Sequence, residues 1–209
     1  MNFYYNGTDI YNDVSVNYCV HEMFAEKQAD TLVIRFNDTK GIWSKWQPAA
    51  GDTVRFKEGA SDTGKMFIHS MKPENGLFTI RAMSMPKTAK IRKSKSWEGV
   101  RFLQLANEFA GNHGLTFKNY GCEDQVYPYI KQSNEGDFSL FSRLCMLEGC
   151  QMLIFDGSLL AYNEHYIEQQ EPAGGLTVDE NGVFTYEDNR DTMFGSCEVA
   201  SGSYSGKYV

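Results

Sequence analysis

Residues 13–85 alternate apolar and polar side chains in the way that is typical of strands with one exposed face. The clearest case is DVSVNYCVHEM, residues 13–23, in which Val14, Val16, Tyr18 and Val20 share one face. Four further runs follow: TLVIRF (31–36), GDTVRFKEG (51–59), DTGKMFIHSMK (62–72) and GLFTIRAMSM (76–85). Five strands joined by short turns, without an intervening helix, predict an antiparallel barrel or sandwich.

A helical period replaces the alternation in residues 96–114. Ser96 is the expected N-cap, and Gly111 or Gly114 the expected end. At 100° per residue, one face collects the apolar side chains of Phe102, Leu103, Ala106, Phe109 and Ala110. This pattern predicts an amphipathic helix that lies on a core.

A second helix is predicted in QSNEGDFSLFSRLCMLEGC, residues 132–150. Asn134 or Ser133 is the expected N-cap, Asp137 is an acid in the first turn, and Gly149 ends the helix. The apolar side chains cover about half of its circumference, so it needs cover on several sides, as in a small α+β domain. A hairpin around the Asp156–Gly157 turn should follow.

These elements predict an α+β fold that is mainly β. Residues 1–86 form the first barrel, 87–95 a basic linker, 96–165 a small α+β domain with two helices, and 166–209 a β-rich segment. The basic run PKTAKIRKSKS (86–96) is read as a solvated linker or loop, with a phosphate-binding patch as the alternative.

Charge separates the C-terminal part from the rest of the chain. The 209 residues carry a formal net charge of −7, which argues against a nucleic-acid binder that relies on phosphate contacts. From residue 164 onward there are nine acids and two bases, so the first 163 residues, with 18 of each, are balanced. The N-terminal sequence lacks the features of a signal peptide, and no apolar stretch is long enough to span a bilayer.

The candidates for chemistry are few, and each has a structural alternative. No two of the four histidines have metal-ligand spacing, and the five cysteines contain no CxxC pair, so we expect no metal, cofactor or catalytic residue. Cys145 lies near a helix C-terminus, where the helix dipole disfavours a thiolate. Glu148 falls within the apolar arc, either as an acid with a raised pKa or as a frayed end that reaches solvent or a base such as Arg143.

Trp43 and Trp46 flank a Pro/Gly turn in GIWSKWQPAAGD, residues 41–52. Tryptophan in such a loop is compatible with a carbohydrate-binding surface, with burial, or with a protein–protein contact. We therefore treat the pair as a candidate interface.

The order of these features resembles one family of phage proteins. ADTLVIRFND, WSKWQPAAGDTV and DTGKMFIHSM resemble a strand–turn–strand opening, and SKSWEGVRFLQLANEFAGNHGL resembles a first small helix. QSNEGDFSLFSRLCMLEGC is similar to a Q-x-N-E-x-D-hydrophobic pattern, and FDGSLLAYN to the strand pair that follows it. The family is the late control protein D family of contractile tail baseplate hubs, related to the myophage hub and to the base of type VI secretion spikes. The likeness covers roughly residues 10–163.

The resemblance implies a structural function. Hub subunits form a homotrimer, each subunit contributing two tube-like barrels, and the trimer joins the tail tube to the central spike. Residues 166–209 would then be a partial or reduced second tube-like barrel. The implied partners are the spike, the tail tube or distal tail protein, the tape-measure protein and the baseplate wedge proteins. The protein would be made in the bacterial cytoplasm and assembled in a virion or a tail-like particle such as a bacteriocin, without inserting into a membrane.

Two further expectations complete this interpretation. The C-terminal acids would line the lumen, where they repel passing DNA without binding it specifically; these candidate lumen acids are Glu187, Asp188, Asp191 and Glu198. The alternatives to a hub are a tail-tip cell-wall hydrolase and a carbohydrate-binding module that uses the two tryptophans.

Overall fold

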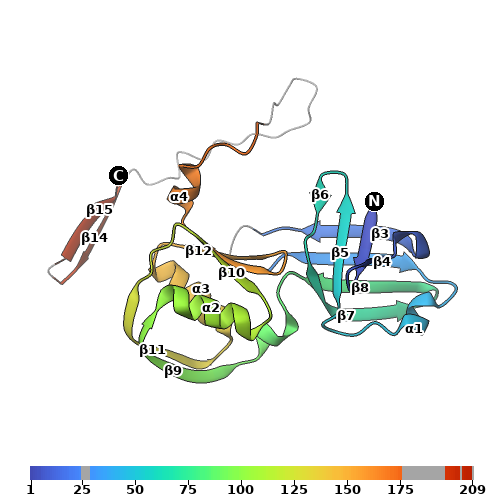
Figure 1. Ribbon diagram of the computed structural model, residues 1–209, viewed down its shortest axis with the longest axis horizontal. Coiled ribbons are helices and arrows are strands. Elements are labelled where there is room, and N and C mark those ends of the chain that lie inside the picture. The colour runs from blue at the N-terminus through green and yellow to red at the C-terminus, as the bar shows by residue number, and fades with distance from the viewer. Residues whose placement is uncertain (25–28, 176–195, 203, 209) are drawn as a thin grey trace. The chain divides into compact units, whose positions relative to one another are not determined.

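The computed structural model describes residues 1–24, 29–175, 196–202 and 204–208. Residues 1–170 form one compact unit and residues 171–209 a second. Within the first unit, a barrel-like sheet precedes a smaller domain that contains two long helices (Figure 1). The predicted fold class, α+β and mainly β, is confirmed.

The barrel-like sheet is antiparallel and contains eight strands. They are β1 (Asn2–Tyr5), β2 (Thr8–Asp9), β3 (Ser15–Glu22), β4 (Thr31–Asn37), β5 (Thr53–Glu58), β6 (Ser61–Asp62), β7 (Met66–Glu74) and β8 (Leu77–Met83). Hydrogen bonding follows the order β2-β1-β5-β7-β8-β4-β3, with β6 paired to β5. The five predicted strands are therefore present, and β1, with its short partner β2, is added to them.

Inward side chains of these strands form the first core, which includes Phe3, Leu32, Ile34, Phe36, Val54 and Ile80. One short helix, α1 (Ile42–Trp46), lies where the sequence suggested only a turn. Its first backbone N–H groups donate to a side chain outside the helix, since Asp38 Oδ1 accepts from Ile42 N at 2.6 Å and from Trp43 N at 3.3 Å. The turn η1 (Tyr11–Asp13) joins β2 to β3.

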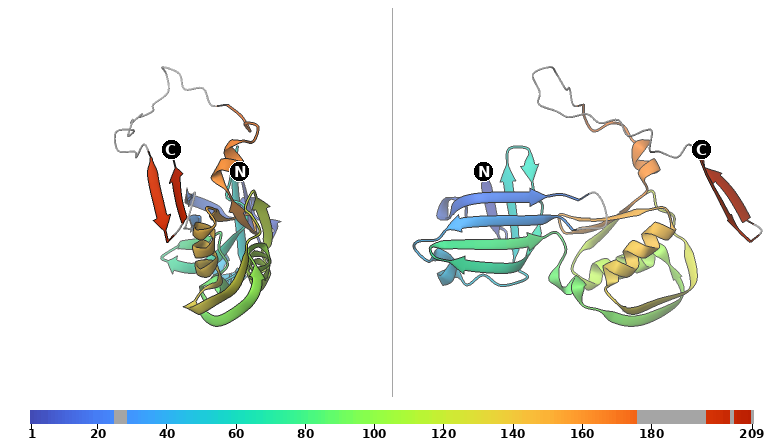
Figure 2. Two further views of the ribbon diagram at one scale, coloured as in Figure 1. Left: turned by 90° about the vertical axis from the view of Figure 1, so that its left-hand side faces the viewer. Right: turned by 180° about the vertical axis from the view of Figure 1, so that it is seen from behind.

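The smaller domain contains two long helices, one short helix, a three-stranded sheet and a two-stranded ribbon. Its elements are the turn η2 (Lys87–Lys90), β9 (Lys93–Arg101), α2 (Phe102–Asn112), β10 (Thr116–Tyr120), β11 (Val126–Glu135), α3 (Asp137–Leu147), β12 (Gln151–Phe155), β13 (Ser158–Tyr162) and α4 (Glu164–Glu168). The sheet order is β10-β13-β12, with β10 parallel to β13, and β9 pairs with β11. The long β9–β11 ribbon curves beside α2 and α3 (Figures 1 and 2).

The first predicted helix begins later than expected. Residues 96–101 belong to β9, with Ser96 paired to Lys131 of β11, so the prediction of Ser96 as N-cap is wrong. The backbone N–H of Leu103, in the first turn of α2, donates to Asp124 Oδ1 at 2.9 Å. A residue distant in the chain therefore supplies the acceptor that a local N-cap would otherwise provide. A local capping pattern could not reveal this partner.

The second predicted helix also begins later. Strand β11 continues to Glu135, and Gly136 precedes α3, so the N-cap prediction of Asn134 or Ser133 is wrong. Asn134 instead has a φ of 48°, at a register shift between Gln132 and Glu135. Asparagine tolerates this left-handed conformation better than most residues, which fits it to a β-bulge.

Residues 87–95, predicted as a basic linker, form η2 and the first part of β9. Lys93 and Lys95 form ion pairs with Asp137 and Glu108 of the smaller domain, at 2.7 and 2.6 Å. Part of the basic run is thus integrated into that domain.

In the second unit, the structure describes residues 171–175, 196–202 and 204–208. Strands β14 (Cys197–Ser201) and β15 (Tyr204–Tyr208) form an antiparallel hairpin. A hairpin by itself is a marginal structure in water, so a larger sheet would have to be completed by other segments or chains.

Candidate functional site

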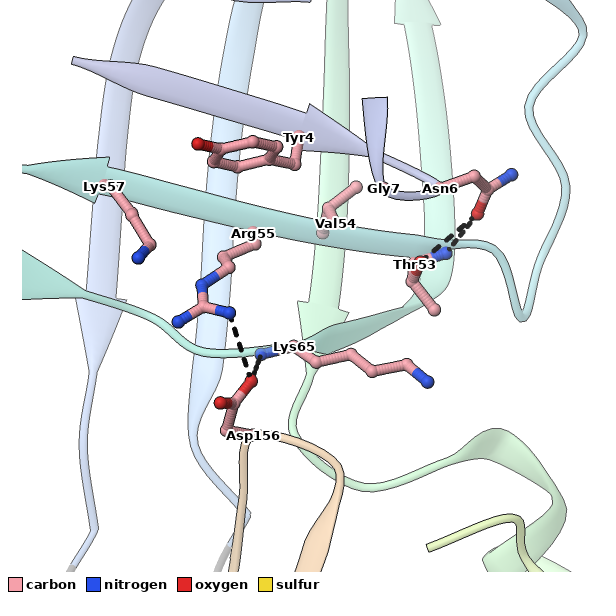
Figure 3. A pocket seen from close by; sticks show the side chains of 9 residues that line it. All are labelled: Tyr4, Asn6, Gly7, Thr53, Val54, Arg55, Lys57, Lys65 and Asp156. Carbon is pink, nitrogen blue, oxygen red and sulfur yellow. Dashed lines mark hydrogen bonds and ion pairs between the residues drawn. The ribbon is translucent and has the colours of Figure 1, made fainter. Parts of the chain in front are cut away.

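A hollow of about 540 Å³ lies on the outer face of the barrel, beside the tip of the β12–β13 hairpin (Figure 3). We call it the β5 groove. Nine residues line it: Tyr4, Asn6, Gly7, Thr53, Val54, Arg55, Lys57, Lys65 and Asp156. Three of these nine side chains are cationic and one is acidic.

Strand β5 positions two of the cations. Val54 and Phe56 are buried in the barrel core, so Arg55 and Lys57 between and after them point to the outer face. Tyr4 of β1 lies directly opposite Arg55 in the antiparallel register and therefore on the same face. The strand pairing thus places an aromatic ring beside the two cations.

An acid outside the lining holds these cations in place. Arg55 donates to both carboxylate oxygens of Asp62, from Nε at 2.8 Å and from Nη2 at 2.7 Å. Lys57 Nζ lies 2.8 Å from the same carboxylate. The hydrogen bonds from Arg55 hold the pKa of Asp62 well below its usual range, and the same contact raises the pKa of Arg55.

The fourth charged residue comes from the hairpin tip. Asp156 and Gly157 have φ of 45° and 73°, as the predicted two-residue turn requires. Asp156 Oδ1 accepts a hydrogen bond from the backbone N–H of Lys65 at 2.9 Å and lies 3.5 Å from Arg55 Nη1. A Cβ at Gly64 would lie 3.1 Å from the Cβ of Asp156, so glycine permits this close approach. The hairpin tip is therefore fixed to the barrel.

The sequence did not identify this groove. The alternation in TVRFKE, residues 53–58, does place Arg55 and Lys57 on one exposed face, and that signal was available. Lys65 and Asp156 lie further along the chain. The folded β12–β13 hairpin brings Asp156 to the barrel, so its position depends on tertiary structure.

Two residues of the Q-x-N-E-x-D pattern, Gln132 and Asp137, are buried and belong to a second polar feature. Asp137 is 1% exposed, and four donors surround its carboxylate. Lys93 Nζ lies 2.7 Å and Asn112 Nδ2 3.0 Å from Oδ2, and Gln132 Nε2 donates to Oδ1 at 2.9 Å. His113 Nε2 lies 3.1 Å from Oδ2. We call these five residues the Asp137 cluster.

The cluster has a clear charge arrangement. Burial raises the pKa of Asp137, but the hydrogen bonds from Lys93, Gln132 and Asn112 outweigh it, and the net pKa lies below the ordinary value. Burial lowers the pKa of His113, against the opposing effect of Asp137. A neutral His113 donates from Nε2 to Asp137 and accepts at Nδ1 from the Thr88 hydroxyl, 3.0 Å away. These contacts join five segments of the smaller domain, so the pattern is structural.

The two tryptophans lie in different environments. Trp43 is 1% exposed and stacks on Phe78, with ring centroids 5.2 Å apart and an interplanar angle of 7°. Trp46 is 40% exposed and meets the edge of Trp43. Trp43 therefore contributes to the barrel core, and an interface role for the pair would depend on Trp46.

Of the candidate lumen acids, Glu187, Asp188 and Asp191 lie outside the described residues. Glu198 lies on β14, is exposed, and is 3.6 Å from Lys207 Nζ on β15. Its charge is therefore partly offset within the hairpin, and its position relative to a lumen stays a prediction.

Glu148, the acid within the apolar arc, has a hydrogen-bond partner in Tyr127. It accepts a hydrogen bond of 2.5 Å from the Tyr127 hydroxyl, and burial together with this contact raises the pKa of Tyr127. Glu148 also lines a hollow of about 330 Å³ with Glu123, Cys150 and His165, a grouping that sequence reasoning missed. Cys145 is buried, and burial raises the pKa of its thiol, which disfavours the nucleophilic thiolate.

Within the described part of the chain, no group of three or more His, Cys, Asp or Glu residues could hold a metal ion. None of the helices described there is long and apolar enough to cross a membrane.

Two solved structures share this fold. The 43 kDa tail protein of prophage MuSo2 from Shewanella oneidensis matches 77% of this chain and 53% of its own length, with a TM-score of 0.56 and 12% identity. A tail protein from Neisseria meningitidis MC58 matches 77% of this chain and 49% of its own, with a TM-score of 0.57 and 11% identity. The chain therefore spans about half the length of these proteins. No protein-family model and no curated protein matches the sequence.

Proposed function

We propose that this chain is a structural subunit of a baseplate hub in a contractile tail or phage-like particle. Three copies would form a ring that joins the tail tube to the central spike. The observation that carries this proposal is the shared fold with two tail proteins over 77% of the chain. The order of a barrel and a small α+β domain, which the sequence patterns predicted, supports the same assignment.

A structural role also agrees with the way the polar side chains are used. The charged groups of the Asp137 cluster are bonded to one another inside the smaller domain. The most distinctive sequence pattern therefore stabilises the fold, and the proposed function is not enzymatic. The C-terminal hairpin, β14–β15, would join a larger sheet in the assembled ring.

In this proposal the partners are two further copies of the chain, the spike, and the tail tube or distal tail protein. The tape-measure protein and the baseplate wedge proteins are further proposed partners. The protein would be made in the bacterial cytoplasm and would end in a virion or tail-like particle, with DNA passing through the lumen without specific binding.

Labelling of intact particles tests this proposal. Antibodies against the chain, visualised with gold by electron microscopy, should mark the baseplate end of the tail, and quantitative mass spectrometry should give three copies per particle. Label spread along the whole tube, or a copy number other than three per particle, would contradict a trimeric hub.

The hydrolase alternative has its own test, because Glu123 and Glu148 line one hollow. We expect no clearing of cell walls by the purified protein in zymography. Clearing that is lost in the Glu148→Gln variant would replace the structural proposal with an enzymatic one.

A further inference from the structure

We propose that Cys122 and Cys150 are a site of oxidative modification, at which a peroxide joins them in an intramolecular disulfide bond. All five cysteines of the chain are free in the structure. Both members of the pair lie in the smaller domain, so the bond does not depend on the role of the protein in a tail.

The two thiols are in direct contact. Both are buried in the core of the smaller domain, where Cys122 is 6% and Cys150 2% exposed. The Cys122 thiol donates a hydrogen bond to the Cys150 sulfur. Side chains that share such a bond point toward each other, as the geometry of a disulfide requires. Cys145 belongs to the same core, but within the described part of the chain it makes no hydrogen bond with either thiol.

Backbone contacts hold both cysteines in position. Cys122 lies between β10 and β11, where its N–H donates to Asn119 Oδ1 at 3.1 Å and its carbonyl oxygen accepts from Asn119 Nδ2 at 2.9 Å. Cys150 lies between α3 and β12, and its N–H donates to the carbonyl oxygen of Cys145 at 2.8 Å. A disulfide would therefore link two connecting segments that are already ordered.

A small oxidant can reach one of the two sulfurs. Cys150 lines the hollow of about 330 Å³ that also contains Glu123, Glu148 and His165, whereas Cys122 is not among its lining residues. The hydrogen bond also makes the thiols unequal, because it favours a thiolate at Cys150 and disfavours one at Cys122. Cys150 is therefore the thiol that the peroxide oxidises first, and Cys122 completes the bond.

The disulfide forms in two balanced steps. With hydrogen peroxide, the Cys150 thiolate attacks one oxygen, the O–O bond breaks, and a hydroxide ion leaves and takes up the proton that the thiol lost. The Cys122 sulfur then attacks the sulfur of the Cys150 sulfenic acid, the S–O bond breaks, and the hydroxyl group leaves as water with the Cys122 proton. Two thiols and one peroxide give one disulfide and two waters, and the two electrons that the sulfurs lose reduce the peroxide.

The bond should form slowly. Burial raises the pKa of both thiols, and the carboxylates of Glu148 and Glu123 add to this effect at Cys150, so little thiolate is present at neutral pH. A rapid redox sensor needs a low thiol pKa. The pair instead suits a stabilising bond that accumulates once the protein meets an oxidising medium. Because β11 and α3 lie between the two cysteines, the bond would close a loop that restricts the unfolded chain.

Peptide mapping of the full chain tests this inference. The reduced protein is incubated overnight with millimolar hydrogen peroxide, its remaining thiols are alkylated in urea, and the chain is cleaved after lysine, arginine and glutamate without reduction. Cleavage after Glu148 separates Cys145 from Cys150, so the map distinguishes the possible pairs. We expect a cross-linked pair of peptides that carry Cys122 and Cys150, which dithiothreitol should release.

Urea unfolding gives a second readout. Oxidation should lower the equilibrium constant for unfolding about hundredfold and raise the urea midpoint, as expected for a disulfide that closes a loop. Cys122→Ala and Cys150→Ala should each abolish the cross-link and this gain. The matched control is Cys145→Ala, which removes the third thiol of the same core and should retain both. Circular dichroism checks that the variants fold, and the map of the unmutated chain needs no variant.

A cross-link between Cys122 and Cys150 that stabilises the oxidised protein would support the proposal. It would be overturned if both thiols are still alkylated after the peroxide treatment, or if Cys145 replaces Cys122 in the cross-link. Recovery of Cys150 as a sulfinic acid without a bonded partner would also overturn it. An oxidised protein that is no more stable than the reduced one would rule out a stabilising bond.

Discussion

Replacement of Asp137 by alanine should strongly destabilise the protein, because it removes a buried carboxylate that four donors share. Lys93, Asn112, His113 and Gln132 would each lose a partner. Removing one partner of a buried ion pair costs about 3–5 kcal/mol, and each orphaned buried donor adds about 1–3 kcal/mol.

The lower end of that range applies here. Lys93 is 37% exposed and can turn toward water, so its charge need not remain buried without a partner. We therefore expect Asp137→Ala to lower the free energy of unfolding by about 3–4 kcal/mol, a large part of the 5–15 kcal/mol typical of a domain. Asp137→Asn keeps one acceptor and should cost less, about 2–3 kcal/mol.

Urea unfolding followed by circular dichroism measures this loss as a shift of the midpoint. Asp13→Ala is the matched control, because Asp13 is exposed and its replacement should change stability by less than about 0.5 kcal/mol. A loss below about 1 kcal/mol for Asp137→Ala would refute the conclusion that the cluster stabilises the smaller domain.

The same cluster predicts that acid destabilises the protein. The pKa of His113 is lowered by burial, so the unfolded chain takes up a proton first and stability falls as the pH drops below about 6.5. The pKa of Asp137 is also lowered, so its contribution is present above about pH 4 and is lost as the pH falls further. In Asp137→Asn the second loss should shrink, as urea midpoints between pH 8 and pH 3 would reveal.

Two further predictions concern packing. Trp43→Ala should lower the free energy of unfolding by about 3–5 kcal/mol, whereas Trp46→Ala should lower it by less than about 1 kcal/mol. Thermal unfolding of the two variants compares them directly, and equal losses would contradict the burial of Trp43. A Cβ at Gly136 would lie 2.8 Å from the backbone oxygen of Ala89, so Gly136→Ala should cost about 1–3 kcal/mol. Gly111→Ala, which meets open space inside α2, should be neutral or slightly stabilising, and a loss as large as that of Gly136→Ala would argue against the steric explanation.

The strands of the barrel could be predicted from the sequence because their period depends on local burial. In TLVIRF, Leu32, Ile34 and Phe36 are fully buried in the structure, as the alternation indicates. The prediction of a hairpin turn at residues 156–157 is also confirmed, since the Asp-Gly pair is a local signal. Local patterns were sufficient where local chemistry determines the backbone.

The helix starts could not be predicted in the same way, because their partners are distant. The Asp124 carboxylate accepts a hydrogen bond from the backbone N–H of Leu103, in the first turn of α2, although it lies 21 residues later in the chain. The pattern from Gln132 to Asp137 was interpreted as a helix cap, but it contains a β-bulge at Asn134 and a buried carboxylate at Asp137. A polar run before an apolar helix has the same sequence pattern whether it caps the helix or forms a bulge and a buried carboxylate.

The candidate site also contains features that local sequence predicts and features that it does not. The exposed face shared by Arg55 and Lys57 follows from strand period, whereas the positions of Lys65 and Asp156 depend on how the hairpin tip meets the barrel. Trp43 and Trp46 are close in sequence but differ in burial because the short helix α1 turns one of them inward. The sequence alone could not distinguish them.

The mass of the assembled protein tests the central proposal most directly. Native mass spectrometry of the full chain, alone and with the spike protein of the same particle, should detect a species of three times 23.7 kDa, either free or bound to the spike. A chain that remains a monomer at high concentration and also in the presence of the spike would contradict a trimeric hub.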